Sequence, residues 1–172
     1  MGSSSTLQDL GSSKESRRRR IGRRSGFAVL VLVVGAGLTG FLGPSEGTDT
    51  AEGGGYTLTV THGAKVRSGQ PVPLEITVEG PGAFSGPVEL AFDPEVFDRF
   101  DFQNWYPNPD GESRSDSELT YEFAPPDGNV LVVHLDARVA PGLGISRNEH
   151  WIAVMDGSEE LVRIDYTVWV MP

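Results

Sequence analysis

The segment YTLTVTHGAKVRSGQPVPLEITVE, residues 56–79, decides the fold. Apolar and polar side chains alternate near both of its ends, and the alternating apolar residues are Tyr56, Leu58, Val60, Leu74, Ile76 and Val78. Alternation with a period of two is typical of a strand with one buried face. The intervening Ser-Gly-Gln-Pro at 68–71 has the composition of a tight turn. The segment therefore predicts two consecutive antiparallel strands.

The same alternation recurs along the rest of the chain. It predicts five further strands, near residues 88–92, 119–123, 131–139, 151–155 and 162–170. Gly, Pro and Asp fill the breaks between them, as turns require. No apolar stripe of helical period interrupts this pattern, although Asp93-Pro94-Glu95 has the composition of the start of a one-turn helix. Residues 56–172 are thus predicted to form an all-β sandwich of about seven antiparallel strands.

The run YTLTVTHGAKVRSGQPVPLEITVEGPG, residues 56–82, resembles the first two strands of bacterial immunoglobulin-like modules of cell-surface proteins. The resemblance implies an immunoglobulin-like antiparallel β-sandwich. It covers residues 56–92 best and extends to the C-terminus only in the number of strands. The cysteine pair of antibody domains is missing, because the chain contains no cysteine. Modules of this fold serve many roles, so no functional residue is carried over.

A second informative stretch is RRRRIGRRSGFAVLVLVVGAGLTGFLG, residues 17–43. Residues 26–43 are uncharged, and as a helix they would span about 27 Å, close to the hydrocarbon thickness of a bilayer. They predict a transmembrane helix, which is either retained as a signal anchor or removed as a signal peptide. No A-x-A motif follows the run, and its absence favours retention.

The predicted domain organisation follows from these two stretches. Residues 1–25 are expected to be a disordered basic cytoplasmic tail, and the segment PSEGTDTAEGGG at 44–55 a flexible linker. Residues 56–172 would form the extracytoplasmic domain. The basic residues before the apolar run predict a cytoplasmic N-terminus, since positive charge is retained on that side of the membrane.

Charge is divided unequally along the chain, whose net value is -10. Residues 1–26 hold seven basic and two acidic side chains, whereas residues 44–172 hold seven basic and 22 acidic ones. A domain this negative is repelled by phosphates, so nucleic-acid binding is excluded. The absence of cysteine excludes disulfides and thiolate chemistry.

Motifs for catalysis or metal binding are not apparent in the sequence. His62, His134 and His150 lie on separate predicted segments rather than in a cluster with carboxylates, as a zinc site would require. No G-x-S-x-G nucleophile motif occurs. The sequence predicts a protein that is not an enzyme and carries no cofactor.

The acidic loop at residues 108–118 allows two interpretations. It matches part of an EF-hand pattern, but Tyr106 and Ser117 stand at the first and last ligand positions, where Asp and Glu are needed. A looser calcium site and a solvated polar loop both stay open. The residues for such a calcium site are Asp110, Glu112, Asp116 and Glu118.

Aromatic residues are concentrated between Phe97 and Tyr106, where five of ten residues are aromatic. Some of them must fill the core of a domain this small. Those that stay exposed would form a platform for a partner. The candidate partner-binding residues are Trp105, Tyr106, Phe102 and Asp101.

These observations favour binding over catalysis. The leading hypothesis is a single-pass membrane-anchored scaffolding protein that serves as an accessory subunit of a membrane or envelope protein. The alternative is a carbohydrate-binding module of the cell envelope, secreted or anchored, in which Trp105 and Tyr106 contact the sugar.

Overall fold

The structure is a computed structural model that describes residues 13–38 and 43–171. The chain divides into two units, Met1–Gly43 and Pro44–Pro172. The first contains one helix and the second all of the strands.

Helix α1 (Ser13–Leu38) is the described part of the first unit. Its residues Ile21–Leu38, with a mean hydropathy of 1.5, are long and apolar enough to cross a membrane. A signal sequence near an N-terminus would share both properties. The predicted span at 26–43 overlaps this helix as far as Leu38, and residues 39–42 lie outside the described part.

The disordered tail predicted at 1–25 needs a correction, because the helix already begins at Ser13. Arg, Lys and Glu are good helix formers, and no proline interrupts residues 13–38. The apolar helix is therefore continued towards the N-terminus by the basic tract. Residues 1–12 lie outside the described part.

The second unit contains ten strands and one short helix among its described residues, rather than about seven strands. In chain order they are β1 (Ser45–Gly53), β2 (Tyr56–Arg67), β3 (Pro71–Glu79), β4 (Val88–Phe92), α2 (Pro94–Arg99), β5 (Phe100–Tyr106), β6 (Gly111–Arg114), β7 (Leu119–Phe123), β8 (Val130–Val139), β9 (Ser146–Asp156) and β10 (Glu159–Met171). The seven predicted strands correspond to β2, β3, β4, β7, β8, β9 and β10.

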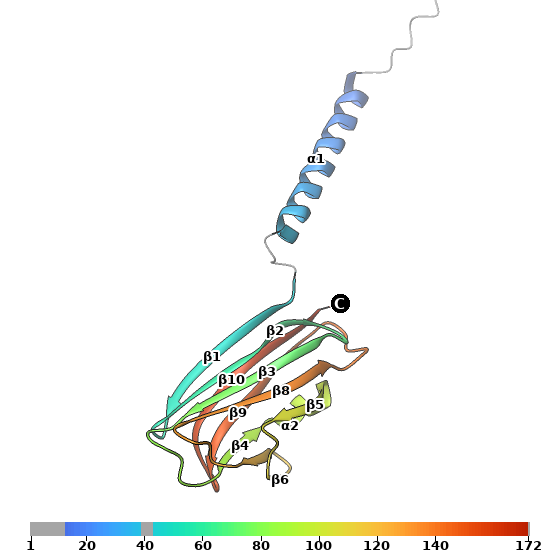
Figure 1. Cartoon of the computed structure of the whole chain (residues 1–172). Coiled ribbons are helices and arrows are strands. Elements are labelled where there is room, and N and C mark those ends of the chain that lie inside the picture. Colours follow the sequence, from blue (N-terminus) through green and yellow to red (C-terminus); the bar gives the residue numbers. More distant parts are fainter. Residues whose placement is uncertain (1–12, 39–42, 172) are drawn as a thin grey trace, which may run out of the picture. The chain divides into compact units, whose positions relative to one another are not determined.

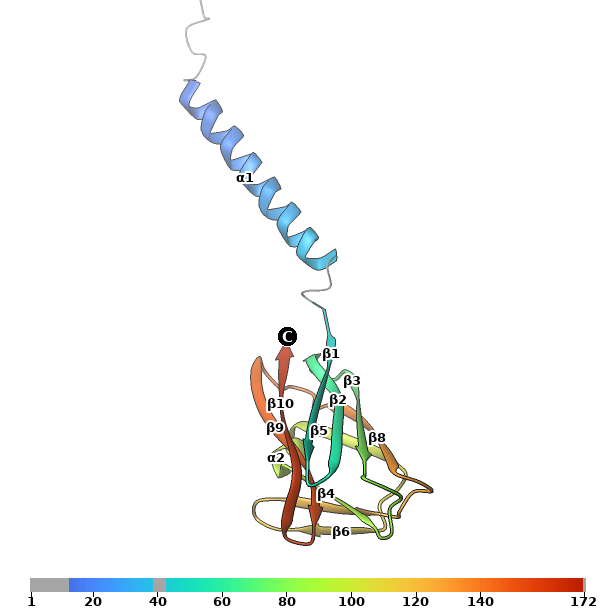
Figure 2. The same cartoon turned by 90° about the vertical axis from the view of Figure 1, so that its left-hand side faces the viewer.

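The strands form a sandwich of two layers, as the sequence predicts (Figures 1 and 2). Hydrogen bonding follows the order β5-β8-β3-β2-β10-β9-β4-β7-β6, with β1 added beside β2. Strand β2 pairs antiparallel with β3 through 57–61, and its end at 65–67 pairs parallel with β10. Because β2 passes from one layer to the other, β1, β2, β3, β8 and β5 lie in one layer and β10, β9, β4, β7 and β6 in the other.

The core lies between the inner faces of the two layers. Every second residue of β8 is buried, from Leu131 to Val139, and the same holds in β10 from Val162 to Val170. These faces join one apolar cluster with β3, β4, β7 and β9. The period-two pattern of the sequence is thus the pattern of burial.

The sandwich has two ends, which are named here for later use. The entry end is where β1 begins, and it also holds the β2–β3 turn, the β8–β9 connection and the end of β10 (Figure 1). The distal end holds the β1–β2 turn, the β3–β4 loop, the β7–β8 loop and the β9–β10 turn.

The flexible linker predicted at 44–55 is wrong, because Ser45–Gly53 forms strand β1. It pairs antiparallel with β2 over nine residue pairs, and threonine hydroxyls face each other across the two strands at 3.1 Å. Gly54 and Gly55 have φ values of 57° and 84° and connect Gly53 to Tyr56 as a two-residue hairpin turn. Polar composition misled the prediction, since β1 is a mostly exposed strand.

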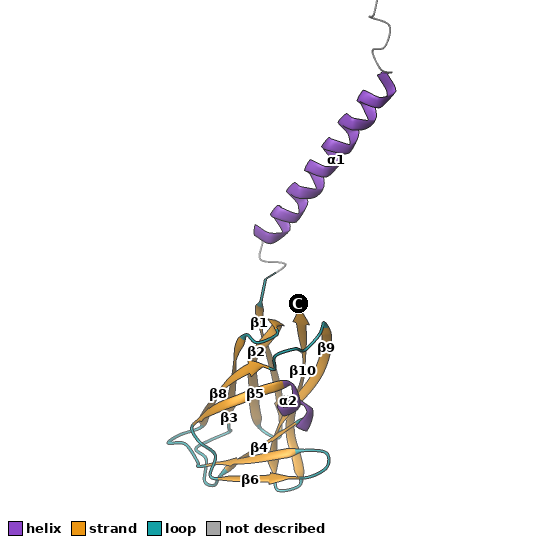
Figure 3. Cartoon of the chain, turned by 90° about the vertical axis from the view of Figure 1, so that its right-hand side faces the viewer, coloured by secondary structure: helices purple, strands orange, loops and turns teal. Residues whose placement is uncertain are grey.

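Strands β5 and β6 are also absent from the predicted set. In β5 the alternation is broken by a register shift between Phe102 and Asn104, and β6 is a short strand with three exposed residues. The one-turn helix start is confirmed by α2, the short purple helix in Figure 3. Asp93 caps it by accepting a hydrogen bond from the Glu95 amide, and Pro94 occupies the first turn.

We expect the Gly53→Ala variant to be destabilised by about 1–3 kcal/mol, because a Cβ atom at this position would lie 2.5 Å from the Leu161 carbonyl oxygen. Urea unfolding of the detergent-solubilised chain measures the change. Gly144→Ala is the control, since no atom lies within 4 Å of its added Cβ. If the two variants were equally stable, the close contact between Gly53 of β1 and Leu161 of β10 would be contradicted.

Candidate functional site

The four residues proposed from the sequence for partner binding all lie on β5. Trp105 and Phe102 are partly buried and pack against the core, whereas Asp101 and Tyr106 are exposed. The Trp105 ring centroid lies 4.3 Å from that of Tyr121 and 5.7 Å from that of Phe92. The core role expected for part of the aromatic group thus holds for Trp105 and Phe102. Tyr106, 76% exposed, has no aromatic neighbour at the surface among the described residues.

An open cleft of about 550 Å³, called the distal cleft here, lies at the distal end. The residues that line it lie in or beside three connections: the β1–β2 turn, the β3–β4 loop and the β9–β10 turn. Its large side chains are Tyr56, Pro81, Phe84, Pro87, Met155 and Leu161, but most of its accessible surface is polar. A concave surface of this volume is of the size that ligand sites have.

The β3–β4 loop that forms one wall is held in place by its backbone. The Gly80 amide donates to the Asn129 carbonyl oxygen at 2.8 Å, and the Phe84 amide donates to that of Gly128 at 2.9 Å. The rings of Phe84 and Tyr56 stack with centroids 6.1 Å apart and planes at 27°. These contacts fix an aromatic pair in the cleft wall, so that a partner meets a preformed surface.

Negative charge surrounds the distal cleft. The segments that form the distal end, residues 52–57, 78–89, 122–131 and 154–161, contain eight carboxylates and no basic residue. The carboxylates are Glu52, Glu79, Glu89, Glu122, Asp127, Asp156, Glu159 and Glu160. Asp156 itself lines the cleft. A mainly polar cleft with an aromatic pair in its wall and carboxylates on the surrounding segments suits a partner that presents positively charged groups beside an apolar one.

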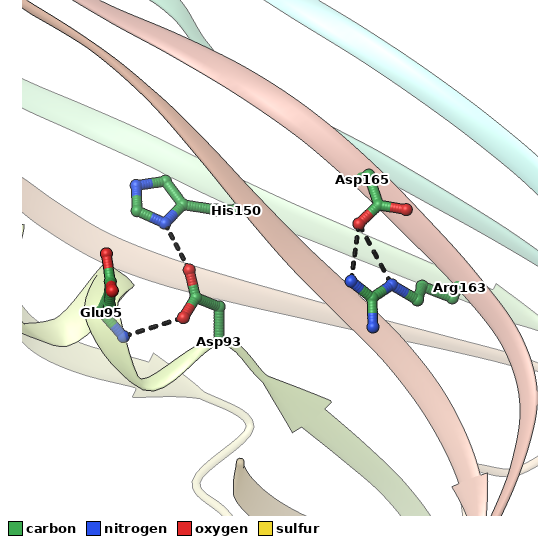
Figure 4. A network of polar contacts seen from close by, with 5 residues as sticks. All are labelled: Asp93, Glu95, His150, Arg163 and Asp165. Atoms are coloured by element: carbon green, nitrogen blue, oxygen red, sulfur yellow. Dashed lines mark hydrogen bonds and ion pairs between the residues drawn. The ribbon is translucent and has the colours of Figure 1, made fainter. Parts of the chain in front are cut away.

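Two histidines are buried in carboxylate pairs within the sandwich. His150 Nδ1 lies 2.7 Å from Asp93 Oδ2, while Asp93 Oδ1 accepts from the Glu95 amide (Figure 4). His62 Nε2 lies 2.9 Å from Asp49 Oδ2. The second ring nitrogen of each histidine has no hydrogen-bond partner in the described structure. The pairs join β9 to the start of α2 and β2 to β1, which indicates a structural role.

Tyr166 lies between these two histidines. Its ring centroid is 4.6 Å from that of His62 and 5.9 Å from that of His150. Burial, followed by the charge of Asp93, raises the pKa of the Tyr166 hydroxyl. The cavity beside Tyr166 has a volume of about 20 Å³, which is room for about one water molecule.

Metal ligation is not suggested by the described residues, which include no group of three or more His, Asp or Glu side chains arranged to hold an ion. The acidic loop at 108–118 contains strand β6 and a turn in which the Ser115 amide donates to the Glu118 carbonyl oxygen at 2.9 Å. Part of the loop is therefore a β-hairpin with β7.

The distal cleft was missed from the sequence because its residues come from three separate connections. The one local signal is the segment GPGAFSGP at 80–87, where a single phenylalanine stands in a loop otherwise made of Gly, Pro, Ala and Ser. A large aromatic residue in such a loop either packs against the core or contacts a partner. Phe84 is partly buried against the core, and it also lines the distal cleft.

Comparison with protein-family models and with curated proteins gives no match. Among solved structures, a chain of a type I cohesin–dockerin complex from Clostridium thermocellum is 14% identical, with a TM-score of 0.39, covering 63% of this chain and 90% of that one. A conjugative transposon lipoprotein from Bacteroides eggerthii is 19% identical, with a TM-score of 0.34, covering 66% of this chain and 96% of that one. At these identities the likeness is one of fold alone.

Replacement of Trp105 by alanine is expected to destabilise the sandwich by about 2–3 kcal/mol, because it removes a partly buried ring from the core. Tyr106→Ala, at the adjacent exposed position, should change the free energy of unfolding by less than about 0.5 kcal/mol. Urea unfolding compares the two. Similar effects of both variants would show that Trp105 is not part of the core.

Alkaline pH should destabilise the sandwich through Tyr121. Burial, followed by the Glu112 carboxylate, raises the pKa of its hydroxyl from 10.0 to about 12. The contribution of Tyr121 to the free energy of unfolding is then complete below pH 10 and is lost towards pH 12, because the unfolded chain releases the hydroxyl proton at a lower pH than the folded chain. Tyr121→Phe should reduce that fall, measured by urea unfolding at several pH values. The exposed Tyr106→Phe is the control, and an unchanged fall in Tyr121→Phe would refute the assignment.

Proposed function

We propose that this chain is a single-pass membrane protein whose β-sandwich acts as a binding module outside the membrane. In this role it serves as an accessory or scaffolding subunit for a protein partner. The observation that carries the proposal is the distal cleft, a mainly polar hollow with an aromatic pair in its wall, at an end of the sandwich whose segments carry eight carboxylates and no basic residue. The partner is accordingly a protein with a basic, partly apolar segment.

Retention of α1 as the anchor is part of this proposal. The best site for signal cleavage in the sequence, at Ser45-Glu46-Gly47, falls inside β1. Cleavage there would remove residues that pair with Lys65, Gly63 and His62 of β2. This loss of strand pairing supports an uncleaved helix. The basic residues before the apolar helix support a cytoplasmic N-terminus and an extracytoplasmic sandwich.

The residues that line the distal cleft include the carboxylate of Asp156 and no histidine or basic residue, and we infer a binding role for this arrangement.

Carbohydrate binding is the alternative proposal, and it rests on Tyr106, which is 76% exposed on β5. Because Trp105 packs into the core, a sugar on this side would stack on one ring rather than two. If Tyr106→Ala lost retention of cell-wall glycan while the sandwich stayed folded, the alternative would replace the leading proposal.

Affinity purification of the full-length protein from detergent-extracted membranes tests the leading proposal. We expect one stoichiometric partner, and its recovery should fall at least about fivefold in the Asp156→Asn/Glu159→Gln variant, because two carboxylates beside the distal cleft are neutralised. Partners are identified by mass spectrometry.

The matched control is Glu95→Gln/Asp98→Asn, which neutralises two exposed carboxylates on α2, away from the cleft. Equal losses in both double variants would indicate a general charge effect and contradict a role for the cleft. The intact mass of the same preparation reports whether the chain is cleaved. A mature chain beginning near residue 48 would remove the anchor from the proposal.

A further inference from the structure

The entry end of the sandwich is built by three segments that are distant in sequence. Gly69 of the β2–β3 turn donates to the Val139 carbonyl oxygen at 3.0 Å, and Ser68 Oγ accepts from the Gly142 amide at 2.9 Å. The end of β10 joins them where Trp169 pairs with Lys65. Residues 64–74, 137–148 and 166–171 thus form one continuous surface.

The charge of this surface is opposite to that of the rest of the sandwich. The three segments contain four basic residues and no acidic one, whereas residues 44–172 as a whole hold seven basic and 22 acidic residues. Three of the four, Arg67, Arg138 and Arg147, are exposed. The carboxylates that border the surface include those of Glu46 and of Glu149, which lies 3.4 Å from Arg147. Near Arg138 they include Asp101, opposite it on β5, and Asp136, which shares a pocket with Pro71 and Arg138.

Apolar side chains project from the same surface. Ile145 in the β8–β9 connection is 77% exposed, and Trp169 near the end of β10 is 50% exposed. The guanidinium of Arg147 lies 5.7 Å from the centre of the Trp169 ring. Exposed Trp and Ile beside Arg are typical of protein surfaces that lie at the level of lipid headgroups.

Chain length keeps the entry end near the membrane if α1 spans it. The helix ends at Leu38 and β1 begins at Ser45, so seven Cα–Cα steps join them. Fully extended, this connection reaches at most about 25 Å, whatever path it takes. The start of β1 is therefore confined to the zone just outside the hydrocarbon.

We propose that the entry end binds anionic lipid headgroups, with Arg67, Arg138 and Arg147 contacting the phosphates and Ile145 and Trp169 entering the interface. The inference depends on α1 as an anchor but not on the partner proposed for the distal cleft. An anionic surface attracts the basic end and repels the acidic end, so the distal cleft is turned away from the membrane.

A fluorophore attached to a single cysteine tests the proposal, since the chain has no cysteine of its own. The full-length Ile145→Cys protein is labelled and reconstituted into nanodiscs of phosphatidylcholine, with or without phosphatidylglycerol. A nitroxide on the lipid headgroup acts as the quencher. We expect quenching at least about threefold stronger in the anionic nanodiscs, and the difference should disappear at high salt, which screens the charges.

Two controls are matched to the variant. A label on Val130→Cys, 42% exposed at the distal end, should not respond to the lipid charge. Arg67→Gln/Arg147→Gln should abolish the response at position 145, whereas Arg114→Gln/Arg163→Gln, which removes the same number of charges outside the entry end, should preserve it.

Equal quenching in neutral and anionic nanodiscs would overturn the proposal, as would equal responses at positions 145 and 130. Failure of the chain to associate with either nanodisc would also overturn it, because it would remove the anchor on which the argument rests. The two quenching results leave the proposed function untouched, whereas loss of membrane association would also remove the anchor from it. Partner recovery through the distal cleft is measured separately in all three cases.

Discussion

Strand β2 hydrogen-bonds to both layers of the sandwich, and the other strands are arranged around this shared strand. It pairs with β1 from Tyr56 to Lys65 and with β3 from Thr57 to Thr61, and its last three residues pair with β10 in the other layer. A strand that contributes to two sheets fixes their separation and their relative register. The alternating apolar residues of β3, β8 and β10 can then meet across one core. This constraint also sets the positions of the entry end and the distal end, because each end is formed by connections from both layers.

The sequence predicts the sandwich well where burial alternates with a period of two. Strands such as β3 and β8 carry one apolar face along their whole length. The alternation that produces this face can be recognised from the local sequence alone. β1 has no such face, and β5 has a register shift at Phe102 that breaks the period. Taken alone, the glycines at 53–55 predict a flexible segment. In the structure they form the β1–β2 turn, and Gly53 is favoured there because a Cβ atom would lie 2.5 Å from the Leu161 carbonyl oxygen.

The candidate sites were less predictable than the fold for a related reason. The aromatic group between Phe97 and Tyr106 is a strong local signal, but packing against Tyr121 and Phe92 uses most of it for the core. The distal cleft and the entry end carry weak local signals, because each draws on connections far apart in the chain. The carboxylate paired with His150 likewise comes from an element distant in sequence, whereas that of His62 lies on the neighbouring strand of a hairpin. The overall charge indicates an acidic domain, but it does not indicate that four of the seven basic residues of the sandwich lie in the segments of the entry end.

The orientation of β1 has a mechanical consequence. This strand is the first element after α1 and runs from the entry end to the distal end, antiparallel to β2 over nine residue pairs. A load applied at the distal end and resisted at the N-terminal attachment pulls β1 along its own axis. In this shear geometry all nine pairs share the load at once, whereas a strand peeled from its end would lose them one after another. If α1 is anchored and a partner is held at the distal end, as proposed above, β1 would transmit tension between them without opening the core.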